Sequence, residues 1–233
     1  MLETLMNLDR ELMVALNLSG SHTTFMNGFF WMISQILIWL PAVLVLFYVL
    51  GKDKKKEAFL IVLAVALVFL LCDQISSGLM KPLFGRLRPG KDPLVMNLLE
   101  YVNNYRGGRF GFPSSHAANS FGFAMFTSLL FRYKPYTAAA FIWASLCAYS
   151  RIYLGVHFPL DVLVGIALGM LIGWGVYKLY VKFRVKFPKM LCTENCGNLP
   201  SGYSKCNVNL LILVLGTILF SIICFAMQLN KFV

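Results

Sequence analysis

Apolar runs of about 20 residues recur along this chain of 233 residues, and they constrain its fold more than any other feature. A helix of that length crosses the roughly 30 Å hydrocarbon layer of a bilayer. Hydrophobic residues make up 58% of the chain and charged residues 13%, and the mean hydropathy is +0.70. One water-soluble core of this size cannot hide so much apolar surface. We therefore predict an all-α fold, a polytopic membrane helix bundle.

The bundle is predicted to contain about six transmembrane helices. They run approximately over residues 26–50, 58–80, 117–131, 136–153, 159–180 and 208–228. Ahead of them, the first 16 residues alternate apolar and polar side chains, which predicts an amphipathic helix lying in the membrane interface. The whole chain, 1–233, forms one membrane-embedded domain in this prediction. Its parts are an interfacial helix and link over 1–25, core motifs over 81–161 and an additional C-terminal span over 207–230.

The distribution of lysine and arginine predicts the orientation of the bundle. Basic residues gather after the first, third and fifth spans, and these loops lie on the same side. Cytoplasmic loops are enriched in such residues, so we assign this side to the cytoplasm and place both termini outside. The basic residues in question are Lys52, Lys54, Lys55, Lys56, Arg132, Lys134, Lys178, Lys182, Arg184, Lys186 and Lys189.

Three polar stretches lie at the ends of the apolar runs, and all three emerge on the opposite face. Residues 81–89 read KPLFGRLRP, residues 113–116 read PSSH and residues 150–161 read SRIYLGVHFPLD. The lysine and arginine residues in these stretches lie on the non-cytoplasmic side, where such residues are usually less frequent. A local cluster of them on this side suggests an anionic ligand.

The first stretch carries Lys81, Arg86 and Arg88 where a span leaves the bilayer. One interpretation is that they are snorkelling anchors in contact with lipid headgroups. However, Pro82 and Pro89 bracket the segment and favour a defined turn. Arginine offers a planar fork and lysine a compact charge to phosphate oxygens, so the set suits a phosphoryl group.

The second stretch places Ser114 and Ser115 immediately before a predicted helix. Their hydroxyls are candidates to cap that helix. A helix N-terminus also offers free N–H groups and the positive end of the helix dipole to an anion, and both interpretations can hold together. His116, one step into the helix, would point at such an anion.

In the third stretch, Arg151 closes one span while His157 and Asp161 open the next. His157 and Asp161 are four positions apart, so they share a helix face or its cap. An aspartate beside a histidine fixes the ring tautomer and supports positive charge on it, as a nucleophilic or basic histidine requires. The alternative is a pair that merely satisfies a buried carboxylate. No HxxxH or HExxH spacing occurs, so we predict neither a metal site nor a cofactor.

In order and spacing, these stretches resemble the motifs of the type 2 phosphatidic acid phosphatase (PAP2) superfamily, membrane lipid phosphatases related to vanadium haloperoxidases. The resemblance covers roughly the second to fifth spans. The matching positions are Lys81, Arg88, Pro89, Pro113, Ser114, His116, Ser150, Arg151, His157 and Asp161. Ser115 departs from the pattern, because the family usually has a glycine there, whose backbone N–H approaches the phosphate closely.

The resemblance implies a metal-independent lipid phosphatase with a phosphohistidine intermediate. His157 would attack phosphorus, Asp161 would orient that histidine, and His116 would protonate the leaving oxygen. The residues expected to bind the substrate phosphate are Lys81, Arg88, Ser114, Ser115 and Arg151.

These motifs do not determine the substrate, because the same phosphate-binding residues suit many phosphorylated lipids. An outward site fits the recycling of a carrier lipid, so polyprenyl (undecaprenyl) diphosphate is the expected substrate. Phosphatidylglycerophosphate, phosphatidic acid and lipid A are the alternatives. We expect a multi-pass protein of a bacterial inner membrane, with the bilayer and a lipid phosphate as partners, no nucleic acid, and the active site on the extracytoplasmic face. A non-catalytic lipid- or anion-binding membrane protein is an alternative of another class, and it would need neither His116 nor His157.

Overall fold

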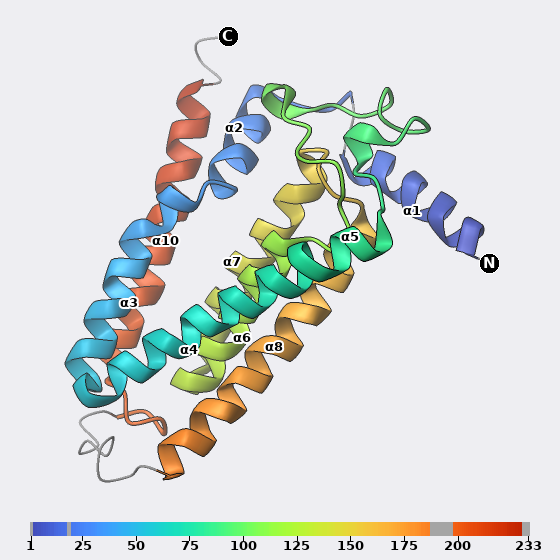
Figure 1. Cartoon of the computed structure of the whole chain (residues 1–233). Helices are drawn as coiled ribbons and strands as arrows, with labels where there is room; N and C mark the ends of the chain where they lie inside the picture. Colours follow the sequence, from blue (N-terminus) through green and yellow to red (C-terminus); the bar gives the residue numbers. More distant parts are fainter. Residues whose placement is uncertain (1, 18–19, 187–197, 230–233) are drawn as a thin grey trace.

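The computed structural model describes residues 2–17, 20–186 and 198–229, and within these residues the regular elements are all helical. The long helices run side by side as a bundle, and the shorter ones lie towards one end of it (Figure 1). The elements are α1 (Leu2–Asn17), α2 (Thr24–Ile33), η1 (Ile36–Trp39), α3 (Leu40–Asp53), α4 (Lys55–Asp73), η2 (Gln74–Met80), α5 (Lys81–Phe84), η3 (Pro89–Lys91), η4 (Val102–Asn104), α6 (Ser115–Phe131), α7 (Lys134–Tyr153), α8 (Pro159–Lys186) and α10 (Lys205–Leu229).

The first predicted span is wrong as a single helix. α2 ends at Ile33, and a turn separates it from η1 and α3. Within the turn, the Ser34 hydroxyl donates to the Trp31 carbonyl oxygen at 2.7 Å, so a side chain competes with the helical backbone pattern. Pro41, which has no N–H to donate to a preceding turn, stands in the first turn of α3. A short polar break inside an apolar run was therefore enough to divide it.

Four segments of the described chain are long and apolar enough to cross a membrane. They are Ile36–Asp53, Lys55–Phe84, Pro159–Lys186 and Lys205–Leu229. α6 is shorter, at 17 residues, and it lies inside the bundle against α4, α7 and α8. Because α6 faces other helices, it tolerates Ser120 and Thr127, whose hydroxyls donate to carbonyl oxygens of the same helix. That about six helices cross the bilayer stays a prediction.

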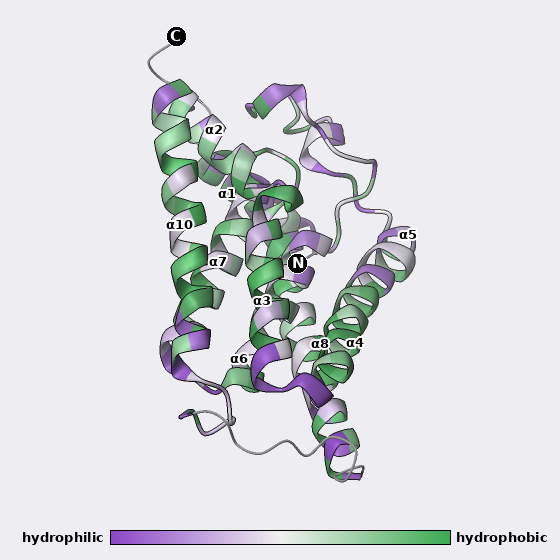
Figure 2. Ribbon diagram, turned by 90° about the vertical axis from the view of Figure 1, so that its left-hand side faces the viewer, coloured by the Kyte–Doolittle hydropathy of each residue, from purple (hydrophilic) through white to green (hydrophobic). Residues whose placement is uncertain are grey.

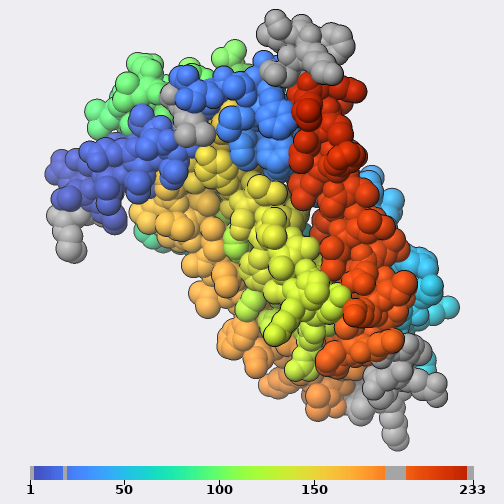
Figure 3. All heavy atoms as spheres, turned by 180° about the vertical axis from the view of Figure 1, so that it is seen from behind, coloured from blue at the N-terminus to red at the C-terminus, as the bar shows by residue number. Residues whose placement is uncertain are grey.

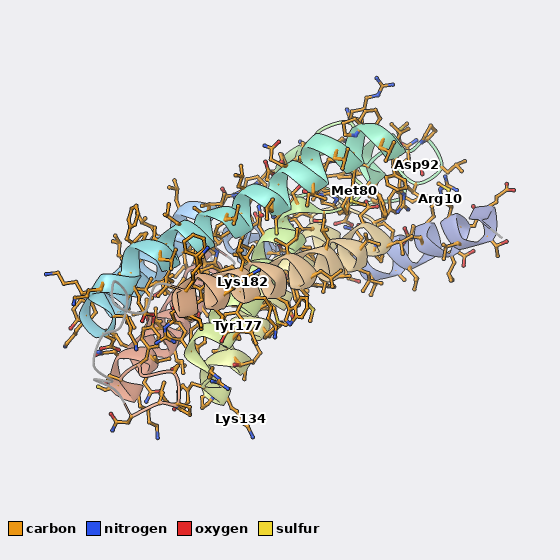
Figure 4. All side chains as sticks on the ribbon, turned by 60° about the horizontal axis from the view of Figure 1, so that its bottom comes forward. Arg10, Met80, Asp92, Lys134, Tyr177 and Lys182 are labelled. Carbon is orange, nitrogen blue, oxygen red and sulfur yellow. The ribbon has the colours of Figure 1, made fainter. Side chains whose placement is uncertain are left out.

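The surface of the long helices is apolar, and polar residues gather at the two ends of the bundle (Figure 2). Phe59, Leu171 and Phe220 are exposed along it, as lipid-facing side chains are. Two of the residues used to predict orientation, Lys134 and Lys182, lie away from the end that carries Arg10 and Asp92 (Figure 4). Lys189, another of them, lies outside the described residues.

A stripe of glycines brings α8 against the backbone of α6. Gly165, Gly169 and Gly173 repeat every four residues, and a Cβ added to any of them would lie 2.5 Å or less from a backbone oxygen of α6 or of its N-cap, Ser114. Small residues at this spacing allow two membrane helices to approach closely. The first turns of α6 and α8 are therefore held together, and these turns carry His116 and Asp161.

α1 forms the predicted N-terminal helix, and its location in the membrane interface stays a prediction. Figure 3 shows it lying over the first turns of α8 at the edge of the bundle. Polar contacts hold it there, among them the following two. The Arg10 guanidinium pairs with Asp92 at 2.9 Å, and the Asn17 amide donates to the Tyr153 carbonyl oxygen at 2.7 Å. Residues 1, 18 and 19 of the predicted interfacial segment and residue 230 of the predicted last span lie outside the described residues.

Candidate active site

The three polar stretches meet at one end of the bundle, as the alternation of the spans predicts. The Ser114 N–H donates to the Asp161 carbonyl oxygen at 2.9 Å, which joins the second stretch to the third. The Gly111 N–H donates to the Arg86 carbonyl oxygen at 2.9 Å, which joins the first stretch to the segment leading into the second. Backbone hydrogen bonds thus fix the relative positions of the candidate residues.

Lys81 follows a π-helical segment, η2, in which the Lys81 N–H donates to Ser76. Single π turns occur often at functional sites. The Lys81 ammonium donates to the hydroxyls of Ser77 at 2.9 Å and Ser115 at 2.7 Å, and these two hydroxyls are 2.7 Å apart. Ser77 also donates to Asp73 at 3.4 Å, so Asp73 lies beside the partner of Lys81. Ser77 was not singled out from sequence, because its role depends on Ser115, 38 residues later.

Ser114 caps α6, as predicted, and its hydroxyl accepts the Ala117 N–H at 3.4 Å. Ser115, the residue that departs from the family motif, carries a hydroxyl that contacts Lys81 and Ser77. Its backbone N–H belongs to the first turn of α6, where such groups lack a helical partner. A serine at this position therefore keeps the free N–H of a helix start and adds a contact that orients the lysine.

Arg88 is held by carbonyl oxygens of two separate segments. Its Nε donates to Phe110 at 3.0 Å and one of its Nη atoms to Val156 at 3.3 Å. The chain around it folds back on itself, since Leu87 and Phe110 form an isolated antiparallel bridge. The guanidinium is thus positioned before any anion binds. Such preorganisation removes part of the cost of arranging charges around a ligand.

Arg151 lies at the end of α7 and is 4% exposed. Its Nε donates to the Ser150 hydroxyl at 3.3 Å, while one Nη atom is buried without a hydrogen-bond partner in the described structure. A cavity of about 380 Å³ opens beside it and is lined by Trp31, residues 34–37, Tyr105 and His116. An unpartnered guanidinium N–H at a cavity is a donor available to an oxyanion.

His157 is positioned by the turn that ends α7. Gly155 has a φ of +74°, a conformation that glycine adopts readily, and the N–H groups of Val156 and His157 both donate to the Arg151 carbonyl oxygen. The imidazole is 1% exposed. Its Nδ1 lies 3.6 Å from Oδ2 of Asp161. This separation is longer than a hydrogen bond, and catalytic hydrogen bonds often tighten only when a ligand is bound.

Asp161 is fully buried, and both of its carboxylate oxygens have further partners. Oδ2 accepts the Phe158 N–H at 3.1 Å, and Oδ1 accepts from the Arg86 guanidinium at 2.6 Å. Arg86 is therefore paired with a carboxylate, whereas carbonyl oxygens hold Arg88. Residue types alone did not distinguish the two arginines, and only the resemblance to the family selected Arg88.

The environment of His157 keeps its ring uncharged. Burial lowers the pKa of His157 well below its ordinary value, and the positive charges of Arg88, Lys81 and Arg151 lower that pKa further, while the Gly111 backbone opposes the shift. A neutral imidazole that donates its Nδ1–H to a carboxylate leaves the Nε2 lone pair available for nucleophilic attack. The site thus holds an uncharged imidazole, the predicted nucleophile, among fixed cations.

The remaining histidines occupy different surroundings. His116 is exposed at the cavity and interacts electrostatically with His157 and with the cations Lys81, Arg88 and Arg151 of the first and third stretches. His22 stacks on Tyr153 with ring centroids 4.2 Å apart, and it contacts Asn17. The structure therefore brings together all the predicted site residues, and it leaves His22 outside them.

Substituting alanine for Gly111 is expected to damage the anion site. The added Cβ would lie 2.8 Å from Asp161 Oδ2 and 3.1 Å from Arg88 Cγ, so one of these side chains must move. We expect the affinity for orthovanadate, a phosphate analogue, to fall about tenfold, or about 1.4 kcal/mol. Titration calorimetry of the detergent-solubilised protein measures it. Gly108→Ala is the control, because nothing lies within 4 Å of its Cβ position, and equal affinities for the two variants would contradict the prediction.

Comparison with known proteins adds a second line of evidence. The profile of the PAP2 superfamily matches residues 57–184. A lipid A 4'-phosphatase of Porphyromonas gingivalis is 38% identical over 232 residues, which cover 99% of this chain and 96% of that protein. A lipid A 4'-phosphatase of Bacteroides thetaiotaomicron is 37% identical over 188 residues, 80% of this chain and 83% of that protein.

Other similarities are weaker. A putative undecaprenyl-diphosphatase of Escherichia coli, YbjG, is 30% identical over 149 residues, 60% of this chain and 70% of that protein. Among solved structures, Aquifex aeolicus LpxE superposes with a TM-score of 0.55 at 28% identity. That superposition covers 72% of this chain and 93% of the LpxE chain.

Proposed function

Because the chain belongs to the PAP2 superfamily and is a membrane lipid phosphatase, we propose that it removes a phosphate group from lipid A. The position proposed is the 4′ phosphate, named for the relatives in Porphyromonas and Bacteroides. This replaces undecaprenyl diphosphate, the substrate expected from sequence, which has less support from the relatives. Because the chain is a phosphoric ester hydrolase, the non-catalytic alternative is also set aside.

The observation that carries the substrate proposal is the extent of the similarity. The family profile begins at residue 57, whereas the similarity to the Porphyromonas protein covers 99% of this chain. The turn between α2 and η1, with Trp31 and residues 34–37, lies ahead of the family core and lines the cavity beside Arg151 and His116. The region of similarity to the Porphyromonas protein thus includes this wall of the cavity, and we expect the lipid part of a substrate to lie next to it.

The proposed reaction begins with the phosphate monoester among Lys81, Arg88 and Arg151. His157 Nε2 attacks phosphorus as the bond from phosphorus to the sugar oxygen breaks, and His116 gives its proton to that oxygen. Asp161 faces Nδ1 and stabilises the positive charge that the ring acquires. The three cations stabilise the negative charge on the transferring phosphoryl group, so this mechanism uses no metal ion.

A second step regenerates the enzyme. His116, now neutral, accepts a proton from a water molecule as the water attacks the phosphohistidine. The bond from phosphorus to Nε2 breaks, and inorganic phosphate leaves. In this mechanism the N–H groups at the start of α6, behind the Ser114 cap, bind one phosphate oxygen. We place the site on the extracytoplasmic face of a bacterial inner membrane, because basic residues gather where helices begin and end at the other end of the bundle. They are Lys52, Lys54, Lys55, Lys56, Arg132 and Lys134.

A substrate panel tests the proposal. Purified protein is given lipid A, undecaprenyl diphosphate, phosphatidylglycerophosphate and phosphatidic acid separately, and phosphate release is measured over a range of concentrations. We expect the highest kcat/KM with lipid A, and we expect mass spectrometry to find its product lacking one phosphate at the 4′ position. A higher kcat/KM with undecaprenyl diphosphate would restore the carrier-lipid hypothesis and overturn this one.

A further inference from the structure

The buried face of α1 is unusual for a helix that lies at the edge of a membrane bundle. Among its described residues, the three buried ones are Asp9, Met13 and Asn17, at 4%, 0% and 0% exposure. They repeat every four residues and form one stripe. Burying a carboxylate costs free energy unless it is paired and hydrogen-bonded, so the partners of Asp9 must offset the cost of its burial.

Asp9 reaches the candidate active site through Arg86. One oxygen of Asp9 pairs with an Nη atom of Arg86, and the other accepts the Leu160 N–H at 2.9 Å. The second Nη atom of Arg86 donates to Asp161 at 2.6 Å. Arg86 also lies over the Phe158 ring, 4.5 Å from its centroid. The guanidinium is thus held between two buried carboxylates, one from α1 and one from the site.

We propose that Asp9 is a positioning residue for the phosphatase reaction, acting on His157 through Arg86 and Asp161. The proposal rests on the roles given to His157 and Asp161 in the proposed function. If Asp161 were the sole acidic partner of Arg86, the positive charge of Arg86 would offset much of the attraction between Asp161 and a positive His157 ring. Asp9 also pairs with Arg86 and offsets part of its charge. The Asp161 carboxylate therefore attracts the positive ring more strongly. Through Leu160, Asp9 also holds the turn that precedes Asp161.

A purely structural role makes a different prediction. α1 has other anchors, including the pair between Arg10 and Asp92, whose residues lie next to each other in Figure 4. If Asp9 served only to dock the helix, loss of Arg10 would have a comparable effect on turnover. If Asp9 acts on Asp161, loss of Arg10 leaves turnover intact, because Arg10 does not contact Arg86.

The experiment compares variants of the full-length protein in steady-state kinetics, with a phosphorylated lipid that the wild type hydrolyses. We expect Asp9→Asn to lower kcat about tenfold, while KM and inhibition by inorganic phosphate stay unchanged, because the phosphate-binding cations are untouched. Asp9→Glu restores the charge and should recover part of the loss. Glu11→Gln, the same charge change at an exposed position of the same helix, and Arg10→Gln should both keep the wild-type kcat.

A double variant tests the path of the effect. If Asp9 acts through Arg86, Asp9→Asn combined with Arg86→Gln should turn over no more slowly than Arg86→Gln alone. The inference is overturned if Asp9→Asn keeps the wild-type kcat, if its effect is confined to KM, if Arg10→Gln is equally slow, or if the losses of Asp9→Asn and Arg86→Gln multiply in the double variant.

His157→Ala separates this inference from the proposed mechanism. An active His157→Ala variant rejects the mechanism, whereas an inactive one beside a fully active Asp9→Asn variant rejects only the role of Asp9.

Discussion

Replacing His157 by alanine is expected to abolish phosphate release and leave the protein folded. The imidazole is the proposed nucleophile, and the proposed mechanism forms the covalent intermediate on no other group. Loss of a covalent nucleophile lowers kcat by a factor of roughly 10³ or more. The His157 ring lies 3.6 Å from the Asp161 carboxylate, beyond hydrogen-bond distance, so its removal breaks no tight ion pair with Asp161. Phosphate release from the lipid substrate measures the effect.

Two controls make that result interpretable. The variant should elute from gel filtration in detergent as the wild type does, which excludes misfolding. A substrate carrying labelled phosphate should leave an acid-labile label on the wild-type protein and none on His157→Ala. Turnover at the wild-type rate would remove the nucleophile assignment, and a persistent protein-bound label would point to another nucleophile.

The second large effect is expected for Arg151→Gln, with a fall in kcat/KM of roughly 10²–10³. Arg151 is buried, and one of its Nη atoms faces no hydrogen-bond partner in the part of the chain that the structure describes. In the proposed reaction this donor binds the phosphoryl oxygens, so we expect it to stabilise their negative charge in the transition state. Steady-state kinetics with the lipid substrate measures the change.

The fold should survive this substitution, because no carboxylate is paired with Arg151 among the described residues. Arg151→Lys keeps the charge and loses the planar fork, so an intermediate activity is expected. Arg132→Gln removes the same charge from an exposed position at the far end of the bundle and should have no effect. Activity of Arg151→Gln within twofold of the wild type would show that this cation does not contact the reacting group.

The sequence predicted the helical class and the meeting of the three polar stretches well, because both depend on signals that are local. Apolar length identifies a span, and the alternation of spans puts Lys81, His116 and His157 at one end without any knowledge of packing. Boundaries were less predictable. The turn at Ser34 and Gln35 divides an apolar run, and hydropathy averaged over 20 residues does not register two polar positions.

The contacts made by Asp9, Ser77 and Arg86 could not be predicted, because each depends on a partner far away in the chain. Asp9 and Arg86 are 77 residues apart, and Arg86 and Asp161 are 75 apart. The one local signal is an aspartate on the same helix face as Met13. The substrate was also unpredictable from the motifs, since they describe the phosphate, which all the candidate lipids share.

The glycine stripe of α8 has a consequence for how such a protein can change over time. Outward positions of that helix, such as Leu163 and Leu171, are exposed, so we expect other apolar side chains to be accepted there. Gly169 has no such freedom, because a methyl group there would push α8 and α6 apart and shift Asp161 relative to His116. A residue deep in the bundle that takes no part in the chemistry thus limits how far the geometry of the candidate site can change.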